Sequence, residues 1–256
     1  MASTGHESLQ VPHAVHFSVI LYAMDVVPAT FEILTALGGV LWKRGMFDYM
    51  DYCCEVGMTE TSCSSQRGAM GAILAGLFEK IDFAVCDTPG VCDTNANAFS
   101  FAAAYLNKPF FQLDMPPDLT GQRSNEYHRE DFKALIRFLE AQTGKKLDYE
   151  RLKENLRELA RQDEIIAELE DLARIVPSPV PVPYNLMIYA SRFLFAGMPE
   201  CTGVLEAMLK VARGNAAQNI SGLSGGKEKL RAFFCYIDHY AQNMQLWQML
   251  DKNGIG

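Results

Sequence analysis

A proline-rich segment divides this chain more firmly than any other feature of its sequence. Residues 176–183 read VPSPVPVP, so four prolines fall within eight residues. Proline fixes its own φ angle and lacks a backbone N–H group, and it therefore breaks a helix and favours extended backbone. Helical patterns lie on both sides of this segment, at residues 148–175 and 184–196. We therefore predict separate helical elements joined by an extended connector.

The first 123 residues alternate between strand-like and helix-like patterns. The continuous apolar run from Phe17 to Met24 is typical of a buried strand, whereas residues 67–78 (RGAMGAILAGLF) have the small and apolar residues of a closely packed helix. The expected order is strand 17–24, helix 29–37, strand 40–42, helix 67–78, strand 81–85, helix 95–106 and strand 109–113. Such alternation is typical of α/β proteins with a parallel sheet, so residues 1–123 are predicted to form a Rossmann-like N-terminal domain.

Helical patterns dominate the middle of the chain, and a new strand pattern follows them. We expect helices at 124–144, 148–175, 184–196 and 200–213, a loop at 221–227, a strand at 230–237 and a helix at 240–250. Asp148 has the side chain of an N-cap for the second of these helices. One strand and one helix cannot complete a parallel sheet. We therefore expect a helical region at 124–226 that includes the connector, followed at 227–256 by the beginning of a second α/β domain that is truncated.

Charge and hydropathy exclude several classes of partner. The chain has 23 basic and 31 acidic residues, a net charge of -8, which disfavours binding to nucleic acid or anionic lipid. Its most apolar stretches, such as residues 187–198, are too short and too interrupted by Arg192 to cross a bilayer, which needs about 20 apolar residues. Residues 1–10 lack the pattern of a secretory leader. We expect a cytoplasmic protein that binds neither membrane nor nucleic acid.

Cysteine is the residue type that most directly suggests chemistry here. The chain has seven cysteines, and in the cytoplasm thiols stay reduced, so metal binding and simple burial are the competing interpretations. Cys63 and Cys92 each precede a predicted helix, in loops that parallel strands gather at one sheet edge. A helix N-terminus favours the thiolate that ligates metal. These two thiols could therefore face one metal site, although their spacing matches no compact CxxC motif.

The other cysteines and motifs carry weaker signals. Cys53 and Cys54 are adjacent, and burial or a spare thiol is the preferred interpretation. Cys235 lies in an apolar strand pattern, and Cys201 follows a proline at a helix start, so neither is a first choice of ligand. Residues 221–227 (SGLSGGK) lack the spacing of a phosphate-binding loop and are interpreted as a linker. The sequence also contains no HExxH and no GxSxG motif, so a zinc hydrolase or a serine hydrolase is unsupported.

Three motifs resemble a known family. They are SCSSQRG around Cys63, CDTNANAF beginning at Cys92, and PFFQLDMPP at residues 109–117. The chain resembles the 2-hydroxyglutaryl-CoA dehydratase D-component family, which includes benzoyl-CoA reductase subunits. The likeness covers most of the chain, and its specificity is concentrated between Cys63 and Pro117.

The resemblance implies a 4Fe-4S cluster between two α/β domains, held by three cysteines with one iron open. Cys63 and Cys92 match the first two ligand positions, and the third is expected beyond residue 256. The triplet CDT occurs at both Cys86 and Cys92, so Cys86 is the alternative, and Cys92 is preferred because a family-like helix start follows it. Ser64, Ser65 and Gln66 lie beside Cys63 and could donate hydrogen bonds to cluster sulfur or to substrate, or could cap the following helix, which is the preferred role. No catalytic residue can be assigned.

The function implied by the resemblance is that of an iron-sulfur subunit of a 2-hydroxyacyl-CoA dehydratase. In such an enzyme an ATP-dependent iron-sulfur activator protein injects one electron, and water is eliminated from the acyl-CoA substrate by a ketyl-radical mechanism. A related second subunit would complete a heterodimer. The alternatives are a benzoyl-CoA reductase-type subunit that reduces an aromatic acyl-CoA, and a non-catalytic subunit with an electron-relay or structural role.

Overall fold

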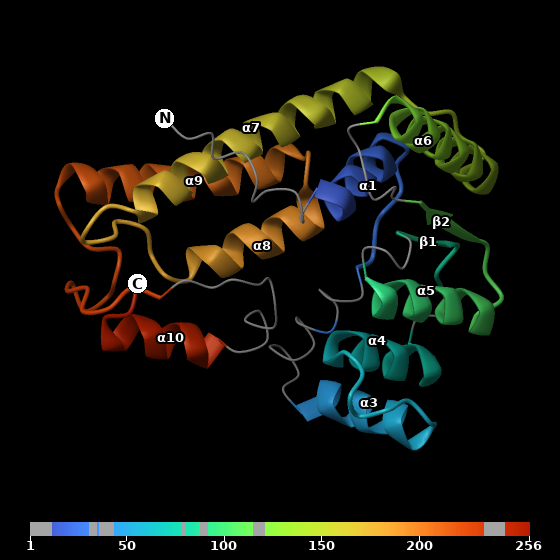
Figure 1. Cartoon of the computed structure of the whole chain (residues 1–256), viewed down its shortest axis with the longest axis horizontal. Coiled ribbons are helices and arrows are strands. Elements are labelled where there is room, and N and C mark those ends of the chain that lie inside the picture. Colours follow the sequence, from blue (N-terminus) through green and yellow to red (C-terminus); the bar gives the residue numbers. More distant parts are fainter. Residues whose placement is uncertain are drawn as a thin grey trace. The chain divides into compact units, whose positions relative to one another are not determined.

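The computed structural model describes residues 12–30, 35, 44–77, 80–87, 92–114, 121–232 and 244–256. Most of these residues are helical, and among them two short strands form a parallel pair (Figure 1). The chain forms two compact units, which we call the sheet unit (residues 34–147) and the helical unit (residues 1–33 and 148–256). This architecture is consistent with the predicted α/β class. The Rossmann-like topology, the truncated second domain and the three-part division stay predictions.

The sheet unit contains a strand, a helix and a parallel strand in succession. β1 (Ala84–Asp87) pairs with β2 (Phe110–Leu113), in a register that sets Ala84 beside Phe110 and Asp87 beside Leu113. Helix α5 (Asp93–Tyr105) connects them, which confirms the predicted helix 95–106 and strand 109–113. The strand predicted at 81–85 exists but begins later, at Ala84. Because the strands are parallel, their carboxyl ends meet at one edge of the sheet.

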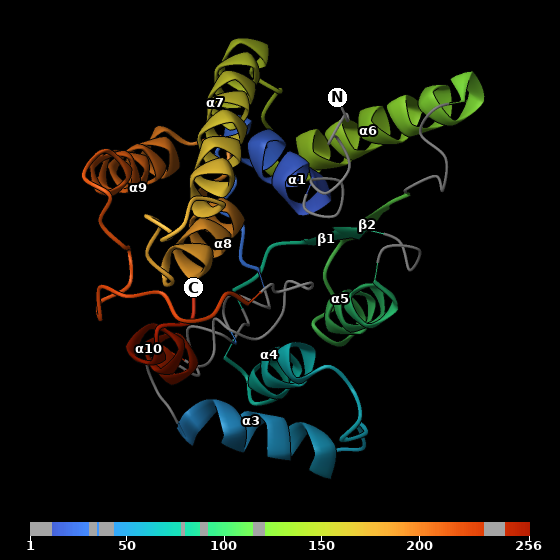
Figure 2. The ribbon, with the colours of Figure 1, turned by 60° about the vertical axis from the view of Figure 1, so that its left-hand side comes forward.

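Helices lie on opposite sides of this strand pair (Figure 2). On one side α6 (Gln122–Thr143) packs against β2, and the ring of Phe138 lies 5.5 Å from that of Phe111 and 5.7 Å from that of Phe83 between centroids. On the other side α5 contacts both strands, and α4 (Ser64–Leu74) and α3 (Arg44–Glu55) follow it outward. In this order α4 packs beside α5, and α5 lies between α4 and the strands.

Small residues let α3 and α4 approach closely. A Cβ atom on Gly71 of α4 would lie only 1.9 Å from the carbonyl oxygen of Tyr49 in α3, so no larger residue fits there without backbone movement. Ala69 and Ala72 of the same helix are fully buried. The sequence predicted this close packing. The helix itself begins earlier than predicted, at Ser64, and ends at Leu74.

The first element of the helical unit corrects one prediction. The apolar run 17–24, predicted as a strand, belongs to helix α1 (Pro12–Ala23). A continuous apolar run can be a buried helix as well as a buried strand, because periodicity cannot separate the two. Residues 18–21 are all buried, and α1 packs against α7 and α8. The buried amide of Asn155 in α7 donates to the carbonyl of Val19 at 3.1 Å, which fixes this contact.

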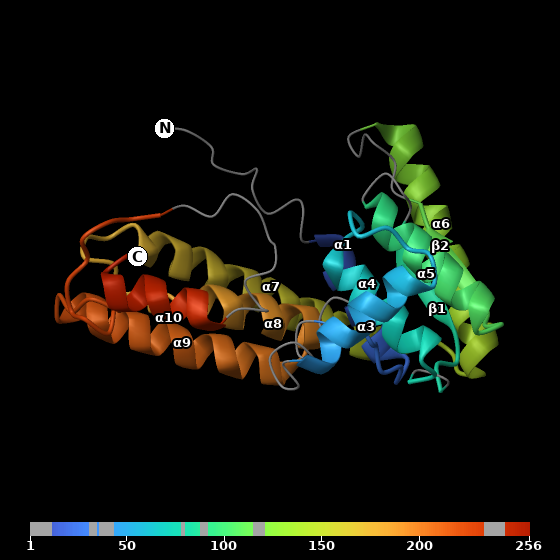
Figure 3. The same cartoon turned by 90° about the horizontal axis from the view of Figure 1, so that it is seen from below.

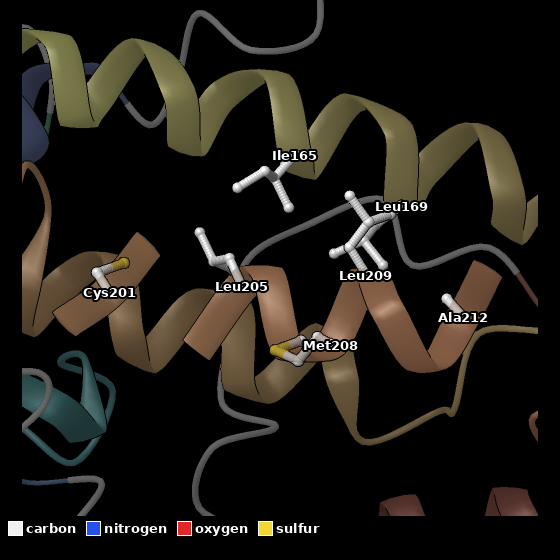
Figure 4. Packing of buried hydrophobic residues seen from close by; sticks show 7 residues of the cluster. All are labelled: Ile165, Leu169, Cys201, Leu205, Met208, Leu209 and Ala212. Carbon is white, nitrogen blue, oxygen red and sulfur yellow. The ribbon is translucent and has the colours of Figure 1, made fainter. Parts of the chain in front are cut away.

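Three further helices form the core of the helical unit. They are α7 (Tyr149–Ala173), α8 (Tyr184–Phe195) and α9 (Pro199–Ala217), all predicted from sequence, and α9 packs against both others (Figure 3). The Asp148 carboxylate accepts from the backbone N–H groups of Glu150 and Arg151, which confirms the predicted N-cap. The buried cluster between α7 and α9 comprises Ile165, Leu169, Cys201, Leu205, Met208, Leu209 and Ala212 (Figure 4). Cys201 therefore serves as a core residue.

The proline-rich connector joins α7 to α8 without regular secondary structure, as predicted. Several hydrogen bonds hold it within the helical unit, among them one from the backbone N–H of Gly222 to the carbonyl of Ser178 at 2.7 Å. The backbone N–H of Ser178 donates to the carboxylate of Glu228 at 2.6 Å, and the amide of Asn215 donates to the carbonyl of Pro179 at 2.9 Å. The connector is thus a packed part of the unit.

The last part of the chain is described only in pieces. Leu230 forms a parallel bridge with Ile255, and α10 (Met244–Asn253) confirms a helix near the predicted 240–250. The rest of the predicted strand 230–237, with Cys235, lies mainly outside the described residues, as do most of the predicted helix 29–37 and all of the predicted strand 40–42. No helix in the described ranges combines the length and the apolar character needed to span a membrane.

Candidate active site

The two cysteines singled out by the sequence occupy equivalent positions in the sheet unit. Cys63 is the N-cap residue of α4, and Cys92 is the N-cap residue of α5. Within the described part of the chain, neither side chain caps its helix through a hydrogen bond. Cys63 is half-buried and Cys92 is exposed. Each thiol thus sits at the N-terminus of a helix, the end toward which the first backbone N–H groups point.

A partly buried hydrogen bond joins the first turns of these two helices. The side-chain nitrogen Nε2 of Gln66 donates to Oδ1 of Asn95 at 2.9 Å. Gln66 lies three residues after Cys63, and Asn95 lies three residues after Cys92. Because α4 and α5 are in contact and are linked at matching positions, the structure brings the two cysteine-bearing helix starts together.

The carboxyl end of β1 adds a carboxylate to the same place. Asp87 is the last residue of β1, and its carboxylate is hydrogen-bonded by the side chain of Asn95. Burial raises the pKa of this carboxyl, and the hydrogen bonds to it offset only part of the effect. Gln112 of β2 donates to the carbonyl of Asp87 at 3.2 Å. The site therefore combines two helix starts with the end of the strand pair.

Cys86, the alternative ligand, has a different environment from Cys92. Its side chain is buried within β1, its Sγ–H donates to the carbonyl of Asp87 at 3.1 Å, and Gln112 Nε2 approaches Sγ at 3.8 Å. Burial raises the pKa of the Cys86 thiol to about 12. At neutral pH this sulfur is a protonated thiol engaged by its neighbours, whereas ligation needs the thiolate.

The serines beside Cys63 are placed by the start of α4. Ser64 is half-buried and is the first helical residue of α4. It does not occupy the N-cap position that was one of its two predicted roles, because Cys63 is the N-cap residue. Ser65 is buried, and its carbonyl accepts from the hydroxyl of Thr35 at 2.7 Å. The start of α4 is thereby fixed from a second direction, which holds Cys63 in place.

A second thiol, that of Cys54 in α3, is contacted by a residue that lies one helical turn after Cys63. The guanidinium Nη1 of Arg67 in α4 donates to Sγ of Cys54 in α3 at 3.2 Å. Cys53, its neighbour in sequence, is buried as predicted, and its Sγ lies 3.4 Å from the sulfur of Met58. The contact of Arg67 with Cys54 could not be predicted from residue spacing, because it depends on how α3 packs against α4.

Sequence reasoning named Gln66 as a possible donor beside Cys63 but missed its connection to Asn95 and Asp87. One signal was present: an amide side chain stands three residues after each candidate cysteine. Among the residues that the structure describes, no three His, Cys, Asp or Glu side chains gather closely enough to hold a metal ion. The ligand assignment to Cys63 and Cys92 therefore stays a prediction, and it covers only two donors.

The family comparison bears on the whole of this site. The protein family described as 2-hydroxyglutaryl-CoA dehydratase, D-component, matches residues 17–256. The chain belongs to this family. Membership of this family supports a role as one component of a 2-hydroxyacyl-CoA dehydratase, an enzyme that has more than one component. The match includes both cysteine motifs and the strand that follows them. No curated protein matches the chain.

Proposed function

We propose that this chain is the iron-sulfur subunit of a 2-hydroxyacyl-CoA dehydratase and that Cys63 and Cys92 hold its 4Fe-4S cluster. The observation that carries the proposal is the Gln66–Asn95 hydrogen bond of 2.9 Å, which ties together the helix starts that bear the two cysteines. Family membership supports the reaction class, and the thiols support the cofactor.

The donor chemistry of the site fits an iron-sulfur cluster. Such clusters are held by cysteine thiolates, and their potentials respond to nearby hydrogen bonds and exposure. Cys63 and Cys92 both lie at helix N-termini, where backbone N–H groups would face a bound cluster. Cys86, buried and protonated between its neighbours, is the less suitable of the two CDT cysteines. The remaining ligands are not assigned to any described residue.

The residues of this chain would bind and orient the cofactor. When bound, a cluster with an open iron would supply a Lewis acid and a one-electron carrier close to the substrate thioester. The first turns of α4 and α5 point backbone N–H groups toward their N-termini, where they oppose the negative charge of the thiolates. The packing of α5 against β1 and β2 holds one of these helix starts on the sheet edge.

The proposed substrate is a 2-hydroxyacyl-CoA. One electron, delivered by an ATP-dependent iron-sulfur activator protein, would convert the thioester carbonyl into a ketyl radical anion. The hydroxyl at the neighbouring carbon would then leave as hydroxide, a proton would be lost from the next carbon, and the electron would be returned. The net reaction is elimination of water to give the unsaturated acyl-CoA. A related second subunit would form a heterodimer with this chain.

Activity is tested on anaerobically purified full-length protein with its partner subunit, the activator, ATP and a reductant. Dehydration of a 2-hydroxyacyl-CoA is the expected result. Reduction of benzoyl-CoA under the same conditions would replace the dehydratase assignment by the reductase one. An intact cluster without either activity would overturn the catalytic role and leave an electron-relay or structural one.

Ligand identity is tested by serine substitution. We expect Cys63→Ser and Cys92→Ser each to lower the iron content of anaerobically purified protein substantially. The matched control is Cys86→Ser, which alters the other CDT triplet and should leave the iron content unchanged. Full iron content in both of the first two variants would refute the assignment, and loss of iron only in the Cys86 variant would transfer the ligand role to Cys86.

A further inference from the structure

We propose that Gln66, Asn95 and Asp87 form a positioning relay that sets how far apart the Cys63 and Cys92 sulfurs are held. The inference rests on the proposed function, which it deepens by naming residues that act on the cluster through its ligands. Gln66 and Asn95 would contact neither cluster nor substrate in this role. They would fix the two helix starts, and Asp87 would fix the relay to the sheet.

The relay has the same spacing as the ligands it would control. Gln66 and Asn95 are 29 residues apart, and so are Cys63 and Cys92. Each amide residue is the third residue of its helix, whereas each cysteine is the N-cap residue. Three residues of helix rise by about 4.5 Å, so each amide lies within one turn of its cysteine. A shift between the amides is therefore transmitted almost directly to the thiols.

The relay is anchored at its inner end. The side chain of Asn95 hydrogen-bonds the carboxylate of Asp87, and Gln112 donates to the carbonyl of Asp87 at 3.2 Å. Cys86 and Gln112 face each other in the register of the strand pair. The strand pair β1 and β2, which has regular backbone pairing, thus fixes the position of α5 relative to α4.

The buried amide of Gln66 is poorly explained by stability alone. Gln66 is only 1 % exposed, and its Oε1 has no hydrogen-bond partner among the described residues. Burying an unpaired carbonyl oxygen is unfavourable, and an apolar side chain of the same length would avoid it. Such an apolar side chain would, however, lack the side-chain nitrogen that donates to Asn95. This is the pattern expected of a residue kept for positioning.

Two variants test the relay. Gln66→Met keeps the length of the side chain and removes its donor. Asn95→Asp keeps the acceptor for Gln66 but places a second carboxylate against Asp87. Loss of a group that orients metal ligands typically reduces metal affinity about 10-fold to 100-fold. We therefore expect both variants, in the anaerobic complex with the partner subunit, to lose iron to a chelator at least about 10-fold faster than wild type, with an altered electron paramagnetic resonance signal.

The matched control and the rescue make the test specific. Gln122 donates from Nε2 to Glu126 at the same distance of 2.9 Å but on an exposed face of α6, so Gln122→Met should keep iron as wild type does. The double variant N95D/D87N exchanges carboxylate and amide and can remake both contacts with Gln66 and residue 87. We expect it to restore iron retention and the spectrum.

The outcomes separate the two levels of the proposal. Wild-type complex that assembles no cluster would overturn the proposed function itself. A wild-type complex with its cluster, together with Gln66→Met that retains iron and spectrum like Gln122→Met, would overturn the relay alone. Should Gln66→Met fail to fold, N95D and N95D/D87N decide: a folded double variant that loses iron as fast as N95D refutes the relay.

Discussion

Replacing Gly71 by alanine should destabilise the sheet unit even though alanine is the better helix former. In an open helical position the change gains about 1 kcal/mol. At Gly71 the new Cβ would lie 1.9 Å from the carbonyl oxygen of Tyr49, whereas ordinary contact begins at 3.4 Å, so α3 must move away by about 1.5 Å. Overpacking of this kind typically costs about 1–3 kcal/mol and occasionally more. A clash between a Cβ atom and a backbone carbonyl is the hardest to relieve, because neither atom can move by a side-chain rotation. We expect a net loss of about 2 kcal/mol.

Gly214 in α9 provides the matched control for this substitution. It also lies inside a helix, but nothing lies within 4 Å of a Cβ built on it. Gly214→Ala should therefore stabilise the protein by about 0.5–1 kcal/mol. Urea unfolding followed by far-UV circular dichroism measures both variants, and their free energies of unfolding should differ by about 3 kcal/mol. Equal stability of the two variants would refute the close approach of α3 and α4.

Two further predictions follow from caps and thiols. Asp148→Ala removes the acceptor for two N–H groups at the start of α7 and should cost about 1 kcal/mol in the free energy of unfolding, measured by urea denaturation; Asp148→Asn should recover most of it. Burial raises the pKa of Cys86 from 9.0 to about 12, so at pH 8 its thiolate fraction is small. In the folded apoprotein at pH 8, iodoacetamide should label exposed Cys92 well before Cys86, as mass spectrometry of peptides would show; equal rates would contradict the burial of Cys86.

Much of the secondary structure could be predicted from the sequence because the interactions that start and end these elements join residues close together in the chain. Asp148 marked the start of α7 because its side chain can satisfy N–H groups two and three residues onward. The prolines of residues 176–183 marked the break between α7 and α8 for an equally local reason. The strand prediction for residues 17–24 was wrong because an apolar run indicates burial but does not indicate the backbone conformation. This segment packs as a helix against α7 and α8, and that packing is a property of the folded unit that the local sequence does not contain.

The candidate site shows the same division. The sequence placed Cys63 and Cys92 before helices, and the structure shows both as N-cap residues. The bond from Gln66 to Asn95 could not be predicted, because it depends on the packing of two helices that are distant along the chain. The Arg67 contact with Cys54 depends in the same way on α3. Side-chain partners of high sequence separation belong to tertiary packing, which residue spacing alone does not contain.

The exposure of Cys92 at the start of α5 sets conditions on how the protein can be handled. An accessible thiol can be oxidised to a sulfenic acid, and continued exposure to oxidant takes it to sulfinic and sulfonic acids. The first product is recovered by thiol reductants and the last is not. Apoprotein stored in air would therefore be damaged at Cys92 before it is damaged at the buried Cys86, and reductant added afterwards would restore only part of it.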